Sequence, residues 1–324
     1  MNFEIAFEDA KKGVKEQAYF MKKALDLGNL KESMKHANLM LVQLKISDIT
    51  PRDYYILFMA VFDELMILES GFRAEYSKGK KKMGDIYEAV QHADSIIPRL
   101  YLMITTGSVL VDSGEMTAQQ VIKDLFHYLK GVQHPFRGLF LRYYFLKMFQ
   151  GKIPESSENY MEKLNAQFGS IETIISVLLE NLVEMNRLWI RINSLIKDKK
   201  SKLRQRSDLK ITVGENIQRL STIEGITLKL YSERVLPPLL EHIVSSKDSI
   251  SQQYLIDCVI HAFPDEYHLE NLESMLNATE NLSRKCDIKL IYILLMERFA
   301  DYSKNSDDDE PRFDVDGNQI ERKP

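Results

Sequence analysis

The stretch from Ile171 to Ile196, which reads IETIISVLLENLVEMNRLWIRINSLI, decides the fold class. Its apolar residues recur at steps of three and four throughout: Ile171, Ile174 (or Ile175), Leu178, Leu182, Met185, Trp189, Ile192 and Ile196. Residues with this spacing lie on one face of an α-helix, whereas the apolar residues of a half-buried strand alternate with polar ones. The stretch therefore predicts a long amphipathic helix with one face against a core.

The apolar pattern fails over the next segment, residues 197–210, which we call the basic segment. It carries seven basic residues against Asp198 and Asp208: Lys197, Lys199, Lys200, Lys202, Arg204, Arg206 and Lys210. The pattern resumes weakly beyond it, and Gly225 ends the run. A single helix this long is unusual, so the segment either interrupts one long helix or is a mobile loop that links two.

Two functions are open for the basic segment. As a solvated helix face or loop it has no binding role, because charged runs usually face water. As a patch it would bind phosphate groups or a membrane. It contains no aromatic residue on which a base could stack, which argues against single-stranded nucleic acid.

Helical spacing and helix caps continue through most of the chain. Gly28 follows a first helical pattern, Thr50 precedes Pro51 at the start of another, and Thr117 with Gln120 forms a capping pair. Helical segments joined by short turns are typical of hairpins that each leave a face for the next to cover. We predict an all-α fold, an α-solenoid of HEAT-like helical hairpins over residues 1–304. The acidic residues 305–324 lack periodicity and are expected to be disordered.

Composition narrows the class of protein further. With 14 glycines and 9 prolines in 324 residues, the chain has few of the turns that a many-stranded β fold needs. Its net charge of -4 gives no overall attraction to nucleic acid or anionic lipid. Two cysteines, early acidic residues and an apolar run no longer than Ile291 to Met296 favour a cytoplasmic protein without a signal peptide or membrane span.

No catalytic signature is present in the sequence. Gly79-Lys80-Lys81 lacks the glycine spacing and the hydroxyl residue of a phosphate-binding loop. The best metal candidate is a set of two thiols and two imidazoles: Cys258, His261, His268 and Cys286. Their spacing fits no known zinc grouping, so a core thiol and surface histidines are the simpler interpretation. We therefore expect no enzyme activity, no catalytic residue, no cofactor and no metal.

Two segments are apolar on nearly all sides, which predicts helices buried all round. The first, residues 96–104, is interrupted only by Arg99, whose charge in a first helical turn faces the positive end of the helix dipole. An internal carboxylate such as Asp94 or Glu88 would stabilise it, and so would an acidic partner protein. The second, residues 134–146, is interrupted by Arg137 and Arg142. Core helices with satisfied arginines remain the alternative for both segments.

These segments resemble the large α-solenoid subunit of retromer, a vacuolar protein sorting family. The resemblance rests on two motifs, Ile97-Pro98-Arg99-Leu100-Tyr101-Leu102 and Gly131-Val132-Gln133-His134-Pro135 followed by Arg137-Gly138-Leu139-Phe140-Leu141-Arg142. Supporting matches are Asp63-Glu64-Leu65, Asn216 through Gly225, and Phe263-Pro264-Asp265-Glu266-Tyr267-His268-Leu269. The similarity runs in unbroken order over about residues 5 to 300, the N-terminal portion of the family.

The resemblance implies a non-enzymatic scaffold of the endosomal sorting coat. In that family this end of the solenoid binds the arrestin-fold retromer subunit, here through Pro98, Arg99, Leu100, Tyr101 and Leu102. A possible secondary motif comprises His134, Pro135, Arg137, Gly138 and Arg142. The family's C-terminal half is missing from this sequence, so the chain is a fragment or a short form.

Further partners follow from the same resemblance: a sorting nexin, a Rab-type GTPase and cargo tails. The coat returns transmembrane cargo from endosomes to the Golgi or plasma membrane. The chain would be cytoplasmic and peripheral on endosomal membranes, reached through partners, and would bind no nucleic acid. The competing hypothesis is an unrelated helical-repeat adaptor that binds nucleic acid or a transport partner through residues 197–210.

Overall fold

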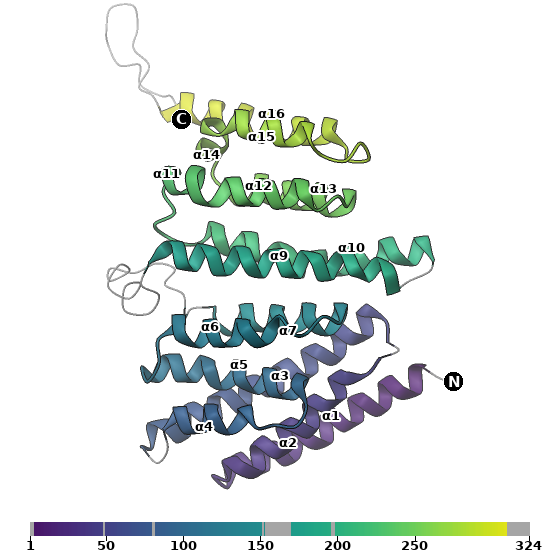
Figure 1. Ribbon diagram of the computed structural model, residues 1–324, viewed down its shortest axis with the longest axis vertical. Helices are drawn as coiled ribbons and strands as arrows, with labels where there is room; N and C mark the ends of the chain where they lie inside the picture. Colours follow the sequence, from purple (N-terminus) through teal and green to yellow (C-terminus); the bar gives the residue numbers. More distant parts are fainter. Residues whose placement is uncertain are drawn as a thin grey trace, which may run out of the picture. The chain divides into compact units, whose positions relative to one another are not determined.

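The computed structural model describes residues 3–47, 49–79, 82–150, 152, 170–195 and 198–309. Within these ranges the regular elements are helices, with no strand among them (Figure 1). The predicted all-α fold of packed helical hairpins is confirmed. The chain divides into two compact units, Met1–Gly225 and Ile226–Pro324, which we call the N-terminal and C-terminal units.

The N-terminal unit is built from helices that follow one another along the chain. They are α1 (Phe3–Asp26), α2 (Leu30–Val42), the 3-10 helix Gln43–Lys45, α3 (Pro51–Ser77), α4 (Met83–Gln91), α5 (Ile96–Ser113), α6 (Ala118–Leu129), α7 (Pro135–Met148), α9 (Ile171–Leu195) and α10 (Lys199–Ser221). The expected caps are present. Thr50 accepts a hydrogen bond from the Asp53 amide, and Thr117 with Gln120 forms a complete capping box.

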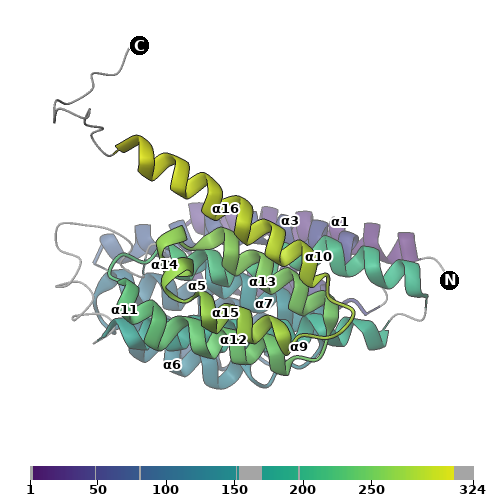
Figure 2. The same ribbon diagram turned by 90° about the horizontal axis from the view of Figure 1, so that it is seen from above.

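Helix α5 lies in the interior of this unit. It packs against α2, α3, α4, α6 and α7. Seen from above, α6 and α9 lie on one side of α5 and α7, and α1 and α3 lie on the other (Figure 2). From Ile97 to Val111 every residue except Arg99 is buried, as the all-round apolar sequence predicted.

The boundary between α4 and α5 differs from the sequence expectation. Helix α4 ends at Gln91 and α5 begins at Ile96, so Pro98 is the third residue of α5 and not the first. The sequence predicts a helix that opens at Asp85 and ends near Ile97, with the next helix starting at Pro98, because the residue before a proline avoids helical angles. Proline is nevertheless tolerated there, because the first four amides of a helix have no acceptor within it.

Helices α9 and α10 are separate, because Asp198 between them is not helical, and the two pack against each other. No single helix runs from 171 to 224, and most of the basic segment is helical rather than a loop. Arg206 is 1% exposed, its guanidinium lies 4.4 Å from the Trp189 ring centroid, and its carbonyl accepts the Trp189 indole N–H at 3.1 Å. The aliphatic stem and planar head of arginine allow this burial against an aromatic ring.

The C-terminal unit contains α11 (Leu228–Leu230), a π-helical turn (Tyr231–Val235), α12 (Leu236–Ser245), α13 (Ser249–Ala262), α14 (Asp265–Glu270), α15 (Leu272–Glu280) and α16 (Ile288–Asp309). Pro237 and Pro238 stand in the first turn of α12, directly after the π-helical turn, and the two prolines favour an interruption of the helix at this point. Arg298 fastens α16 by an ion pair of 2.6 Å with Asp265.

Helix α16 continues to Asp309, five residues past the expected end of the folded region at 304. The remainder of the predicted disordered tail, 310–324, lies outside the described residues. No helix in the described part of the chain is long and apolar enough to cross a membrane.

Candidate partner-binding site

The motif Pro98 to Leu102 begins in the first turn of α5 and mostly faces the core. Pro98, Leu100, Tyr101 and Leu102 are all buried. The Tyr101 ring lies 5.1 Å from that of Tyr144 on α7, and burial raises its pKa well above the ordinary value. Four of the five motif residues therefore hold α5 in place, and a partner could not reach them without unfolding the helix.

Arg99 is the exception, because its side chain is only half-buried. Its Nε donates a hydrogen bond of 2.7 Å to the carbonyl of Ala93, and its Nη2 donates to the same oxygen. Within the described residues no carboxylate pairs with it, so the suggestion that Asp94 or Glu88 does so is wrong. The guanidinium instead closes the α4–α5 turn. Ile96, three residues earlier in the same helix, is 44% exposed.

His134 caps the N-terminus of α7 in the second motif. Its Nδ1 accepts a hydrogen bond from the Arg137 amide at 3.5 Å. Burial lowers the pKa of His134 below its ordinary value, and the charge of Arg137 lowers it further. The neutral imidazole is the form that can accept this bond, so the electrostatics and the cap agree.

Arg137 and Gly138 fix α7 against distant parts of the chain. The Nη2 of Arg137 donates to the carbonyls of Lys45 and Ile46, the latter at 3.3 Å, and thereby joins α7 to the connection that precedes α3. A Cβ on Gly138 would lie 2.6 Å from the Val132 carbonyl and 2.9 Å from Leu188 of α9. Only glycine permits this approach without a shift of backbone.

Arg142 lies inside the N-terminal unit and is 1% exposed. Its Nη1 donates to the Oδ1 of Asn181 on α9 at 3.3 Å, and Asn181 in turn donates to Asn216 on α10 at 2.8 Å. Burial lowers the pKa of Arg142, while the charges of Glu184 and Glu180 oppose that shift. Together with His134, Pro135, Arg137 and Gly138, this residue makes the second motif a junction of helices rather than an exposed surface.

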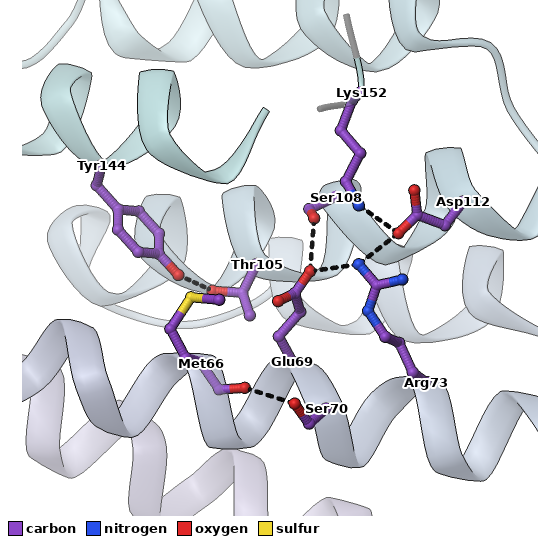
Figure 3. A network of polar contacts seen from close by, with 9 residues as sticks. All are labelled: Met66, Glu69, Ser70, Arg73, Thr105, Ser108, Asp112, Tyr144 and Lys152. Carbon is purple, nitrogen blue, oxygen red and sulfur yellow. Dashed lines mark hydrogen bonds and ion pairs between the residues drawn. The ribbon is translucent and has the colours of Figure 1, made fainter. Parts of the chain in front are cut away.

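A polar network that the sequence analysis did not identify joins α3 to α5 (Figure 3). Glu69, which is buried, accepts hydrogen bonds from Ser108 at 2.8 Å and from Arg73 at 2.7 Å. Asp112 pairs with both Arg73 and Lys152. Glu69 and Arg73 stand four residues apart, as do Ser108 and Asp112, so the sequence shows that each pair shares a helix face. It does not show that these two faces contact each other.

Three of the four candidate metal ligands make other contacts in the described structure. His268 is buried, not at the surface as expected, with its Nε2 3.1 Å from the Ile260 carbonyl. The thiol of Cys286 lies 3.5 Å from the Ser249 carbonyl, and His261 pairs with Asp257 on its own helix. Across the described residues no three histidine, cysteine or acidic side chains are grouped to hold a metal ion.

Comparison with known proteins places these motifs in a family. The sequence model of vacuolar protein sorting-associated protein 35 matches residues 6–321. The chain belongs to this family. Both junction motifs, on α5 and on α7, lie inside the matched range, and the alternative of an unrelated helical-repeat adaptor is thereby set aside.

Relatives in plants, an amoeba and a yeast support the assignment. Vacuolar protein sorting-associated protein 35B of Arabidopsis thaliana is 41% identical over 91% of this chain and 37% of its own length. The protein 35 of Dictyostelium discoideum is 38% identical over 93% of this chain and 38% of its own. That of Schizosaccharomyces pombe is 34% identical over 91% of this chain and 36% of its own. The chain thus spans less than two fifths of these relatives.

Proposed function

We propose that this chain is a non-enzymatic scaffold of the retromer endosomal sorting coat. In this role the α4–α5 turn of the N-terminal unit binds the arrestin-fold retromer subunit. The coat then retrieves transmembrane cargo from endosomes to the Golgi or plasma membrane. Membership of the protein 35 family and the intact Pro98–Leu102 motif support the proposal.

The state of Arg99 carries the proposal. It is the one motif residue that is not buried, and no carboxylate of the described chain neutralises it. Its Nε and Nη2 hydrogen bonds to Ala93 hold the guanidinium plane at the turn. A pre-oriented guanidinium loses less entropy when a partner carboxylate binds its remaining N–H groups. The exposed side chain of Ile96 supplies an apolar neighbour for the same contact.

For the other partners, the proposal rests on family membership alone, and no residue is assigned to them. A sorting nexin, a Rab-type GTPase and cargo tails are proposed to meet the same coat. Membrane association on endosomes is proposed to come through those partners. Arg137, Gly138 and Arg142 join helices by close contacts, as a scaffold requires. A binding turn that is already held in place by the helices behind it loses less entropy when a partner binds.

Titration calorimetry with the purified arrestin-fold subunit tests the proposal. Arg99→Glu should weaken binding by roughly thirtyfold to a thousandfold, the range for an arginine anchor worth about 2–4 kcal/mol. Arg52→Glu is the matched control, since Arg52 is exposed and follows Pro51 in the first turn of α3. A wild-type chain that does not bind would overturn the function. A folded Arg99→Glu chain that binds like the wild type would overturn the site alone.

A further inference from the structure

The outward face of α10 combines basic and aliphatic side chains. Lys200, Leu203, Arg204, Ser207 and Ile211 are all exposed, Leu203 by 50% and Ile211 by 66%. Their spacing of three and four residues places them along one side of the helix, over a length of about 17 Å. We call this set the α10 stripe.

The opposite face of α10 prevents the stripe from turning inward. Arg206, Leu209 and Val213 are buried on that face. The contact of Arg206 with Trp189 and the hydrogen bond from Trp189 to the Arg206 carbonyl fasten it to α9. Because the helix cannot roll about its axis without breaking these contacts, Leu203 and Ile211 stay in solvent in the chain as it stands.

The chemistry of the α10 stripe distinguishes among ligands. A nucleic-acid surface would pair its cations with aromatic or polar side chains, and the basic segment has no aromatic residue. Two large aliphatic side chains gain nothing from contact with phosphate groups alone. At the boundary of a lipid bilayer both kinds of residue are stabilised, since aliphatic groups enter the acyl region while lysine and arginine reach the headgroups.

We propose that the α10 stripe is a direct contact for an anionic phospholipid membrane. Leu203 and Ile211 enter the interfacial layer, and Lys200 and Arg204 lie at the lipid phosphates. This goes beyond the proposed function, in which partner proteins alone bring the chain to the membrane. The net charge of -4 does not prevent the contact, because at physiological salt charges more than about 8 Å away are largely screened.

The contact is expected to be weak and to act together with other attachments. A basic residue near an anionic bilayer strengthens binding by about fivefold. One acidic residue, Asp208, is exposed beside the stripe and opposes the attraction. The α10 stripe would therefore orient a chain already near the membrane, and with purified protein it should be detectable at low salt.

Co-sedimentation of the full chain with vesicles tests the proposal. Phosphatidylcholine vesicles containing phosphatidylserine should bind the chain, and phosphatidylcholine alone should not. The double variant Lys200→Glu with Arg204→Glu should weaken binding by at least about 25-fold, two cations at about fivefold each. Leu203→Ser with Ile211→Ser should weaken it as well, while leaving the dependence on salt unchanged.

The matched control is Lys15→Glu with Lys31→Glu, which makes the same change of charge at exposed positions of α1 and α2. It should bind like the wild type, and soluble phosphoserine should not compete. An equal loss of binding in this control would show that net charge alone explains the effect, and would overturn the proposal. The proposal would also be overturned by equal binding to neutral vesicles, by competition from phosphoserine, or by binding of an acidic peptide but not of vesicles. The α10 variants should keep the melting temperature of the wild type and its affinity for the arrestin-fold subunit. Failure of this proposal can then be distinguished from failure of the proposed function.

Discussion

Arg99 bridges back to the carbonyl of Ala93, six residues earlier in the chain, with its Nε 2.7 Å from that oxygen. The bond spans the turn from α4 to α5 and uses one edge of the guanidinium. The residue that we propose to contact a partner thus also shapes the turn that presents it. The two roles can be separated, because loss of the turn bond costs less than loss of the helix behind it.

The first prediction compares Arg99→Glu with Leu100→Pro. Loss of the bonds to Ala93 should lower the free energy of unfolding by only about 1–2 kcal/mol, partly offset by a negative charge at a helix N-terminus. Proline at Leu100, the fifth residue of α5, removes a helical hydrogen bond inside the core and should cost about 3 kcal/mol or more. Urea unfolding followed by circular dichroism measures both. Equal losses would show that Arg99 is chiefly structural.

A second prediction concerns the close approach at Gly138. Gly138→Ala should destabilise the N-terminal unit by about 1–3 kcal/mol, because the new Cβ would meet the Val132 carbonyl at 2.6 Å. Gly13→Ala in helix α1 is the control. The nearest atoms to its new Cβ would be those at the flexible end of the Gln43 side chain. There the higher helix propensity of alanine should leave stability unchanged or raised. Thermal melts of the two variants should therefore move apart, and parallel shifts would contradict the packing argument.

The buried carboxylate of Glu69 provides the third prediction. Glu69→Ala should cost about 2–3 kcal/mol, because it leaves the buried Ser108 hydroxyl without this acceptor and removes a partner of Arg73. A double-mutant cycle with Ser108→Ala should give a coupling of about 1 kcal/mol. Glu8→Ala, which breaks the exposed pair of Glu8 with Lys11, should change stability by less than about 0.5 kcal/mol. Strict additivity in the cycle would argue against the hydrogen bond.

The fourth prediction concerns pH and His268. Burial lowers the pKa of His268 below its ordinary 6.5, the carbonyl of Ile260 opposes that shift, Arg298 adds to it and Asp265 opposes it. The unfolded chain therefore takes up a proton as the pH falls through 6.5, while the folded chain does not. The stability contributed by neutral His268 is complete above that pH and is lost progressively below it.

Urea unfolding at about pH 7.5 and about pH 5.5 measures this effect. The wild type should lose more stability on acidification than His268→Gln, which does not titrate. The comparison must be made between the two pH values within each protein, because the substitution itself disturbs the packing around Ile260. A His268→Gln chain with the same loss as the wild type would assign the pH dependence to other groups.

Much of the local structure was predictable because it depends on residues close in sequence. Thr50 with Pro51 and Thr117 with Gln120 were expected to begin helices and do so. The apolar run of α5 predicted its burial. The boundary at Pro98 was missed, because proline is compatible with any of the first helical positions and only the fold of the turn selects one.

The contacts made by the residues of the candidate site could not be predicted from the sequence. The motif identified Arg99, yet its acceptor is a backbone carbonyl, and every residue offers one of those. For the basic segment the sequence left a solvated face and a binding patch open, and neither interpretation foresaw that Arg206 is buried against Trp189. Which of several neighbouring basic residues turns inward depends on where α9 places its single tryptophan.

The sequence by itself determined the helical class, the caps and the family, because all three follow from the order and spacing of residues along the chain. Only the tertiary structure decided which side chains meet: Glu69 with Ser108, Arg142 with Asn181, and Arg206 with Trp189. The physical reason is that the backbone geometry of a helix is the same on all of its faces, so the helix itself does not select which face is buried. The neighbours that pack against it decide whether a polar residue on a given face is solvated, paired or left to bind a partner.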